Sequence, residues 1–192
     1  SVVADALVKG AKLNADEALR AMDETANCKY FPSVEQYKKL GYAPYDHDAT
    51  AASNTLEYSY DDWAIYAAAL KMGRKDLADK YAKRALFYRN TFDTTIDFAS
   101  PRYANGQFKK DLDPYQTYDE GFIEGNSWNF SFQAPQDVFG LIKLYGGDKA
   151  FQNRLDELFK MDLPEKYYVD NEDITAEGLV GGYVHGNEPS HH

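Results

Sequence analysis

Two long segments with helical periodicity lie next to each other in the first half of the sequence, separated by Gly73. The first, Ser53 to Met72, places apolar or aromatic side chains every three or four residues, which is typical of one buried helix face. These positions are Leu56, Tyr60, Trp63, Ala67 and Leu70. The second segment, residues 74–92, carries on one face Leu77, Tyr81, Ala85 and Tyr88. Because a short glycine-containing link joins the two, the pattern predicts an antiparallel αα-hairpin.

Shorter helical segments flank this hairpin. They are expected at residues 2–9, 14–26, 34–40, 135–145 and 148–159. The second of them opens with Asn14 followed by Glu17, a pattern similar to a capping box. Residues 93–133 differ, because proline and glycine are scattered there among alternating aromatics, which indicates loops with short strands. No shift in composition marks a domain boundary, so the chain is predicted to be one mainly all-α unit of paired helices.

Charge and cysteine content exclude several classes of function. The chain of 192 residues has a formal net charge of −10, whereas binding to nucleic acid or to an anionic membrane surface needs clustered Lys and Arg. No apolar run approaches the roughly 20 residues of a membrane-spanning helix. Neither nucleic acid nor a membrane segment is therefore expected. The single cysteine, Cys28, leaves no internal disulfide and is expected to be packed as a small hydrophobic residue.

The segment F-I-E-G-N-S-W-N-F-S-F, residues 122–132, is the first candidate for chemistry. Glu124 stands there in apolar and aromatic company. In such surroundings the ionised carboxylate loses hydration, so its pKa is expected to rise, as a general acid requires. A glutamate that simply stabilises a turn explains the pattern as well. The high aromatic content, 15%, also has two interpretations, because aromatic faces stack on sugar rings but also fill helix interfaces.

Two further segments carry clustered polar groups. In T-L-E-Y-S-Y-D-D-W, Glu57 and Asp61 are four residues apart and share a helix face, which an outer, solvated face also explains. The chain closes with H-G-N-E-P-S-H-H, residues 185–192, which holds three of the four histidines.

Three motifs, taken in their order along the chain, resemble glycoside hydrolase family 92. They are T-L-E-Y-S-Y-D-D-W, E-G-N-S-W-N-F-S-F-Q-A-P-Q-D-V-F-G-L-I and H-G-N-E-P-S-H-H. L-G-Y-A-P and L-Y-G-G-D-K-A-F fit the same family. Its members are calcium-dependent exo-α-mannosidases that invert configuration, so the resemblance implies part of an (α/α)6 toroid. It also implies a mannose-containing oligosaccharide as substrate, most simply an α-1,2-linked one, and a periplasmic or extracellular location.

The resemblance assigns roles to single residues. Glu124 matches the general acid, and Asn126 and Trp128 match residues that shape the mannose pocket. From the closing segment it assigns to substrate binding His185, Glu188 and His191. Because Ca²⁺ prefers oxygen ligands, the better candidates for metal ligands are Asn187 and Glu188.

Some positions depart from the family pattern. Gln136 replaces the usual histidine, and Asn129 and Phe130 vary the aromatic run after Trp128. These departures bear on substrate preference more than on reaction class.

Length is the larger departure. Family members are several times longer, with an N-terminal β-sandwich before the barrel, a W-D-T-[FY]-R-like segment upstream and the general-base aspartates downstream. Nothing in the sequence matches these parts. Residues 1–192 are therefore expected to be a piece of the helical domain that lacks its general base and is inactive alone. Unpaired helix faces would make such a piece prone to oligomerisation.

Three other interpretations remain open. A carbohydrate-binding protein without hydrolysis would use the same aromatics and calcium but no protonated Glu124. A helical-repeat scaffold would show self-similarity with a period of about 34 residues, and none is seen. A different six-hairpin glycosidase family would retain the acid but not H-G-N-E-P-S-H-H.

Overall fold

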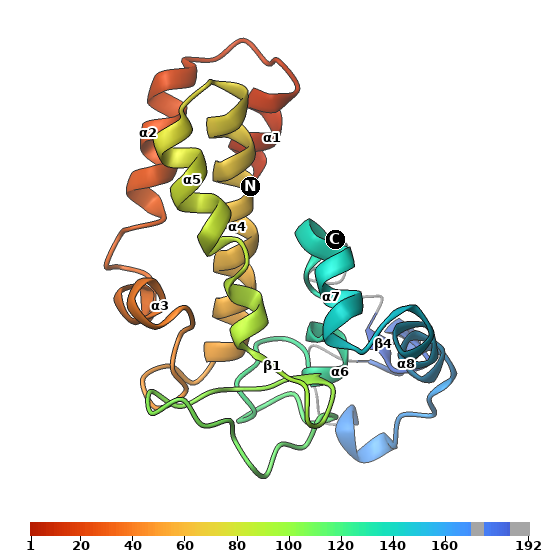
Figure 1. The fold of residues 1–192 in the computed structure, drawn as a ribbon. Helices are drawn as coiled ribbons and strands as arrows, with labels where there is room; N and C mark the ends of the chain where they lie inside the picture. The colour runs from red at the N-terminus through yellow and green to blue at the C-terminus, as the bar shows by residue number, and fades with distance from the viewer. Residues whose placement is uncertain (170–174, 185–192) are drawn as a thin grey trace.

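The computed structural model describes residues 1–169 and 175–184 (Figure 1). The α-helices are α1 (Val2–Val8), α2 (Ala15–Thr25), α3 (Val34–Leu40), α4 (Ala51–Lys71), α5 (Lys75–Arg84), α6 (Ser127–Phe130), α7 (Val138–Leu144) and α8 (Asp148–Lys160). Short 3-10 helices are η1 (Phe87–Asn90), η2 (Pro135–Asp137), η3 (Glu165–Tyr167) and η4 (Ala176–Gly178). The strands form two antiparallel pairs, β1 (Phe92–Asp93) with β2 (Phe98–Ala99) and β3 (Leu179–Val180) with β4 (Tyr183–Val184). The predicted mainly α-helical fold is confirmed.

The long helix α4 organises the molecule. It packs most extensively against α5, which confirms the hairpin, and it also contacts α1 and α2. In Figure 1 these helices form one end of the molecule, and the loops that follow β1 lie at the other end of α4 together with α6, α7 and α8. None of the helices in the described ranges is long and apolar enough to cross a membrane.

The buried face of α4 differs from the predicted one. Leu56 is buried as expected, but Leu70 is 60% exposed, and Tyr60, Trp63 and Ala67 are only half-buried. The buried positions are mostly small: Ala51, Ala52, Ser53, Thr55, Ser59, Ala64, Ala68 and Ala69. Small side chains let neighbouring helices approach α4 closely, so the large aromatics are left at the edge, where Tyr60 stacks on Trp63 at 5.7 Å between ring centroids.

The second helix of the hairpin is shorter than the periodicity suggests. α5 ends at Arg84, and the chain continues through η1 into β1. The predicted inward positions Tyr81, Ala85 and Tyr88 are nevertheless buried. They divide between two cores, because Tyr81 packs with α1, α2 and α4, whereas Tyr88 joins an aromatic core at the other end of α4.

The aromatic core supports the loops that follow β2. Its buried members are Ala52, Leu56, Tyr88, Phe92, Ala99, Phe122, Phe130, Ala134, Leu141 and Tyr145. These residues come from α4, η1, β1, β2, the 121–134 region and α7, so the candidate acid loop is anchored on both sides by buried rings.

Cys28 does not have the predicted environment. It is exposed, and its N–H donates to the carbonyl of Thr25 at 3.0 Å in the turn that ends α2. The expectation of a packed cysteine is wrong because the turn places the residue outside the helix interface.

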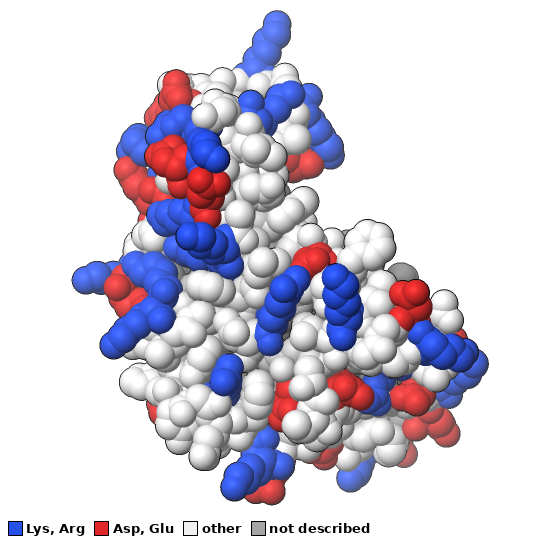
Figure 2. All heavy atoms as spheres, viewed as in Figure 1, with Lys and Arg blue, Asp and Glu red and all other residues white. Residues whose placement is uncertain are grey.

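Charged side chains of both signs are interspersed on the face drawn in Figure 2, and uncharged residues cover much of its middle.

Candidate active-site loop

The loop that carries Glu124 is fastened to the first turn of α4. The carbonyl of Gly121 accepts hydrogen bonds from the N–H groups of Ala52 at 3.0 Å and Ser53 at 3.2 Å, which would otherwise lack partners at the helix start. The N–H of Ile123 donates to Ser53 Oγ at 2.9 Å. Gly121 has φ +87°, and a Cβ there would lie 2.8 Å from Pro101, so this tight turn requires glycine.

Glu124 occupies the corner of this loop. Its backbone φ is +54°, a left-handed conformation that is unfavourable for a residue with a long side chain. Glu124 and Ile123 are exposed, whereas Phe122 and Trp128 on either side are buried. The prediction of a carboxyl buried among apolar side chains is therefore wrong for the part of the chain that the structure describes. Such unfavourable backbone conformations concentrate at functional sites.

Asn126 is completely buried and organises the backbone after Glu124. Its Oδ1 caps the short helix α6 by accepting from the N–H of Asn129 at 3.2 Å, and it also accepts from Asn129 Nδ2 at 2.9 Å. Its Nδ2 donates to the carbonyl of Tyr115 at 3.1 Å. These bonds assign Asn126 to positioning the loop, while the contact with substrate stays a prediction.

Trp128 is 5% exposed and is held by rings and by a cation. Phe98 meets it edge-on at 4.9 Å between centroids, Tyr115 lies at 6.2 Å, and the Arg154 guanidinium is 4.9 Å from its ring centroid. Its Nε1–H is buried and has no acceptor among the described residues. A buried donor without an acceptor is uncommon and costs about 1–3 kcal/mol, so this N–H is a candidate for a further hydrogen bond.

The structure brings β4, which precedes the closing segment in the sequence, against α6. Asn129 Oδ1 accepts from the N–H of Val184, the last residue of β4, at 2.9 Å, and Asn129 Nδ2 donates to the carbonyl of Gly182 at 3.2 Å. The residue that follows E-G-N-S-W and the residue that precedes H-G-N-E-P-S-H-H are therefore directly hydrogen-bonded. The predicted site residues His185, Asn187, Glu188 and His191 lie outside the described residues.

Of the two carboxylates proposed on α4, Glu57 is tied to the segment that follows α6. It accepts a hydrogen bond from Gln133 Nε2. Gln136, the residue that replaces the family histidine, donates to Ser59 Oγ at 3.4 Å and to the carbonyl of Ala85 at 3.3 Å. Its Oε1 is buried and has no donor among the described residues.

Sequence reasoning missed the carboxylate that is most deeply buried on α4. Asp62 is 1% exposed, and its Oδ2 accepts from Tyr37 OH at 2.7 Å and from Arg84 Nε at 2.8 Å. Burial raises the pKa of Asp62 to about 6, although Arg84 and Tyr37 favour the ionised form. Asp62 is three residues from Ser59 and seven from Thr55, which are both buried, so the three share one helix face. The aromatic spacing gave no sign of this face, because its other residues are small.

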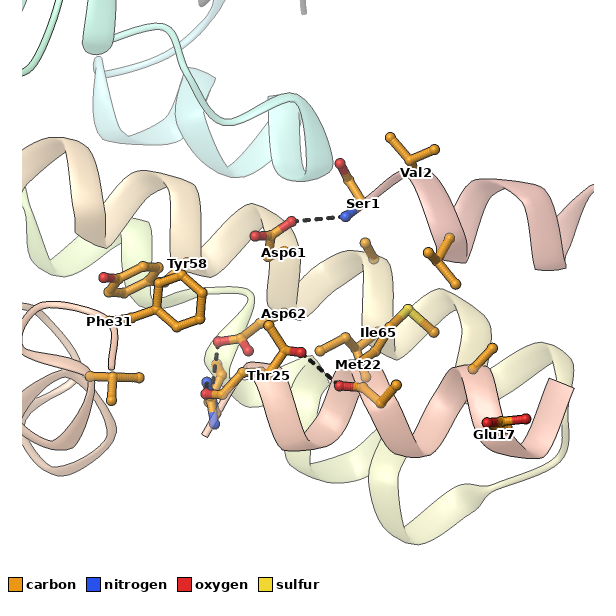
Figure 3. A pocket seen from close by; sticks show the side chains of 17 residues that line it. Ser1, Val2, Glu17, Met22, Thr25, Phe31, Tyr58, Asp61, Asp62 and Ile65 are labelled. Atoms are coloured by element: carbon orange, nitrogen blue, oxygen red, sulfur yellow. Dashed lines mark hydrogen bonds and ion pairs between the residues drawn. The ribbon is translucent and has the colours of Figure 1, made fainter. Parts of the chain in front are cut away.

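A cavity of about 580 Å³ lies beside this network, remote in sequence from the Glu124 loop (Figure 3). Its walls come from α1, α2, α4 and neighbouring turns and are mostly apolar, with Met22, Phe31 and Ile65 among them. Asp62 and Arg84 also border it, but they are already paired with each other. Asp61, the other carboxylate proposed on α4, lines the cavity and pairs with the N-terminal amine of Ser1 at 3.1 Å. None of the residues that the family resemblance assigns to the site lines it.

Within residues 1–169 and 175–184 no three His, Cys, Asp or Glu side chains gather into a group that could hold a metal ion. The predicted calcium ligands Asn187 and Glu188 fall outside these ranges.

Comparison with solved structures identifies close relatives of the whole fold. A family GH92 α-mannosidase from Bacteroides thetaiotaomicron is 35% identical, with a TM-score of 0.88 over 99% of this chain and 24% of its own. Its complex with mannoimidazole superimposes with a TM-score of 0.89. A family GH92 inverting mannosidase from the same organism is 33% identical, with a TM-score of 0.81 over 97% of this chain and 27% of its own.

Sequence comparison agrees. A secreted glycosidase of Arthroderma benhamiae is 29% identical over 89% of this chain and 27% of its own length. The chain thus spans about a quarter of the length of its relatives. The model of the glycosyl hydrolase family 92 catalytic domain matches residues 1–192 of this chain. With its helical-hairpin fold and the anchored E-G-N-S-W loop, the chain belongs to glycoside hydrolase family 92 and forms part of that family's α/α-toroid domain.

Proposed function

We propose that this chain supplies the general-acid side of the active site of an inverting exo-α-mannosidase that removes α-1,2-linked mannose from N-glycans or mannans. The observation that carries the proposal is the loop of residues 121–129, in which a conformationally strained Glu124 is held between α4 and α6. The likeness of the whole fold to family GH92 α-mannosidases, one of them with bound mannoimidazole, supports it.

Glu124 is the proposed donor of the proton to the departing glycosidic oxygen. An exposed carboxyl on a fixed loop can reach a substrate that enters from solvent, and enclosure by substrate and neighbouring segments would then dehydrate it. Trp128 offers a buried N–H without an acceptor among the described residues, which suits a sugar hydroxyl or a group that contacts one. Asn126 holds the loop through its cap of α6.

The closing segment is proposed to hold the sugar. His185, Glu188 and His191 would contact mannose hydroxyls, and Asn187 and Glu188 would be Ca²⁺ ligands because amide and carboxylate oxygens suit this hard cation. When bound, calcium would orient sugar hydroxyls and favour a distorted ring. The link from Asn129 to Val184 supports a common site for this segment and Glu124.

Inversion also needs a general base. Two carboxyl groups about 6.5–9.5 Å apart must enclose the attacking water. We propose that this base lies outside the 192 residues, so the isolated chain does not hydrolyse mannosides. The length of the relatives supports this proposal, because the chain spans only about a quarter of it. A periplasmic or extracellular location is proposed from the secreted relative.

One observation favours a second candidate, carbohydrate binding without hydrolysis. Glu124 is exposed in the described chain, whereas the general-acid role was predicted from an enclosed, apolar environment. In such a protein Glu124→Gln would leave sugar affinity unchanged, and the parent protein itself would hydrolyse no mannoside.

The test compares the isolated chain with the protein expressed from the complete reading frame, using the methyl glycoside of α-1,2-mannobiose, whose hydrolysis releases a single free mannose. Proton NMR should show β-mannose as the first product of the complete protein, and a calcium chelator should abolish its release. The isolated chain should release none. Glu24→Gln, an exposed glutamate on α2, is the matched control and should retain full activity. Absence of mannose release by the complete protein, or α-mannose as the first product, would contradict the proposal.

A further inference from the structure

The side chain of Asn129 makes hydrogen bonds to three groups, one in the loop of Glu124 and two in the β3–β4 hairpin. Its Nδ2 donates to Asn126 Oδ1 at 2.9 Å and to the carbonyl of Gly182 at 3.2 Å, and its Oδ1 accepts from the N–H of Val184 at 2.9 Å. Two amide protons and one carbonyl oxygen are thus all engaged. The residue is half-buried and belongs to none of the apolar clusters of the protein.

The β3–β4 hairpin that receives these bonds is short, and Tyr183 also packs it against Phe159 and against the cluster that contains Trp128. Each strand has two residues. Gly182 also donates from its N–H to the carbonyl of Leu158 at 2.7 Å, at the end of α8. The hairpin is therefore held by α8 on one side and by Asn129 on the other. The directional hydrogen bonds from Asn129 connect it with the loop of Glu124.

We propose that Asn129 is a positioning residue that sets the register between the acid loop and the start of the H-G-N-E-P-S-H-H segment. The inference rests on the proposed function, in which Glu124 protonates a sugar held by that segment. Val184 immediately precedes His185, so a fixed Val184 fixes the point at which the chain enters the segment. In the sequence, Asn129 is only a departure from the family's aromatic run. Its proposed role follows from hydrogen-bond partners 53 and 55 residues away.

The chemistry of the position is specific. Leucine has a similar shape but makes none of the three hydrogen bonds. Aspartate retains the acceptor for the N–H of Val184, but it places a carboxylate against the oxygens of Gly182 and Asn126. The two variants therefore separate loss of all the bonds from loss of the donors alone.

Displacement of the acid relative to the sugar predicts a particular kinetic pattern. A misplacement of about 1 Å can lower a rate on the order of 100-fold. An α-1,2-mannobiose leaving group needs the proton from Glu124, whereas 2,4-dinitrophenolate leaves as a stable anion without one. A mispositioned acid should thus lower kcat on mannobiose far more than on 2,4-dinitrophenyl α-mannoside. General loss of folded protein would lower both rates equally.

The experiment uses the protein expressed from the complete reading frame, with Asn129→Leu, Asn129→Asp and the control Asn153→Leu, an exposed position on α8. Asn129→Leu should lower kcat on mannobiose roughly 10- to 100-fold, with a KM within about threefold of the parent protein. Its loss on the dinitrophenyl substrate should be smaller. Asn129→Asp should fall between Asn129→Leu and the parent protein, and Asn153→Leu should match the parent. An unchanged kcat on mannobiose, or equal losses on both substrates, would overturn the proposal.

Amide hydrogen exchange on the same proteins tests the geometry without turnover. Asn129→Leu should accelerate exchange of the Val184 amide while amides in α4 retain their protection. Unchanged exchange at Val184 would overturn the positioning role even if activity fell. If the parent protein hydrolyses no mannoside, the proposed function fails, and the exchange data still decide the role of Asn129. Asn129→Asp serves both readouts if Asn129→Leu does not fold.

Discussion

At the scale of single residues, the backbone of Glu124 is the least expected feature of the loop. Four non-glycine residues have positive φ among those described, and Glu124, at +54°, is the one with the longest side chain. Its neighbours Gly121 and Asn126 are fixed by hydrogen bonds to α4 and α6, so the corner between them cannot relax. The loop therefore keeps a carboxyl in place at a cost in stability.

This strain gives the first prediction. Glu124→Gly should raise the free energy of unfolding of the chain by about 1 kcal/mol, because glycine adopts left-handed φ without a steric penalty. Urea denaturation measures the change. Glu124→Gln retains the strain and is the control, so its stability should match that of the parent chain. A loss of stability in Glu124→Gly would show that the corner is not strained.

At the scale of elements, α7 is held by its first residues. Asp137 Oδ1 accepts from the N–H of Gly140 at 3.0 Å, and its Oδ2 accepts from Tyr88 OH at 2.9 Å and pairs with Arg89. Burial alone would raise the pKa of Asp137, but the hydrogen bonds from Arg89, Tyr88 and Gly140 outweigh it and hold that pKa below its usual value of 3.8. The charged carboxylate thus connects η1 with α7.

A pH-dependent stability follows from this lowered pKa. Its contribution is complete above the unfolded-state pKa of 3.8 and is lost as the pH falls through the lower folded-state value. Asp137→Ala should therefore lower the free energy of unfolding by about 1–2 kcal/mol at pH 7, and by less below pH 3.8. Asp137→Asn retains the cap and should lose less at pH 7. Urea titrations at several pH values measure this, and a deficit in Asp137→Ala that grows on acidification would contradict it.

The elements also show what the sequence could predict. The periodicity of residues 53–72 and 74–92 located the central hairpin, but the aromatic spacing selected the wrong face of α4. Small residues such as Ala68 and Ala69 were undervalued there, because their burial depends on how closely another helix approaches. The loop of Glu124 was located by its motif. Its conformation depends on hydrogen bonds between Gly121 and α4, which connect positions some 70 residues apart and leave no local pattern.

At the scale of the whole molecule, the buried ion pair of Asp62 and Arg84 joins the helices at one end. Arg84 also donates to Asn27 Oδ1 at 3.2 Å and to the carbonyl of Ala26 at 3.1 Å, while Tyr37 brings α3 into the network. Removal of one charge from such a pair leaves the other without compensation.

Arg84→Leu should therefore lower the free energy of unfolding by about 3–5 kcal/mol at pH 7.5. The loss should be smaller at pH 5. Because the pKa of Asp62 is already raised to about 6 beside Arg84 and rises further without it, the variant folds with a protonated carboxyl at low pH and loses stability as the pH rises. Urea denaturation at both pH values measures this. The double variant Asp62→Leu with Arg84→Leu should recover much of the stability at pH 7.5, and an equal loss in the single variant at both pH values would count against the account.

Large apolar side chains remain exposed on several elements of the described chain. Phe139 on α7 and Val2 on α1 are each 81% exposed, and Tyr30 is 88% exposed. We expect the isolated 192-residue chain to self-associate at micromolar concentration because such surfaces are removed from water on association. Sedimentation velocity measures this, and Phe139→Ser should weaken the association. A monomer at all concentrations would show that these side chains are tolerated in water.

In the proposed function, Glu124 is the general acid. The most direct measurement compares Glu124→Gln with the parent protein, expressed from the complete reading frame, on two substrates. We predict that kcat/KM falls by about 100-fold or more on α-1,2-mannobiose. On 2,4-dinitrophenyl α-mannoside it should fall by less than about tenfold, because that leaving group needs no proton. Equal losses on both substrates, or full activity on mannobiose, would contradict the assignment.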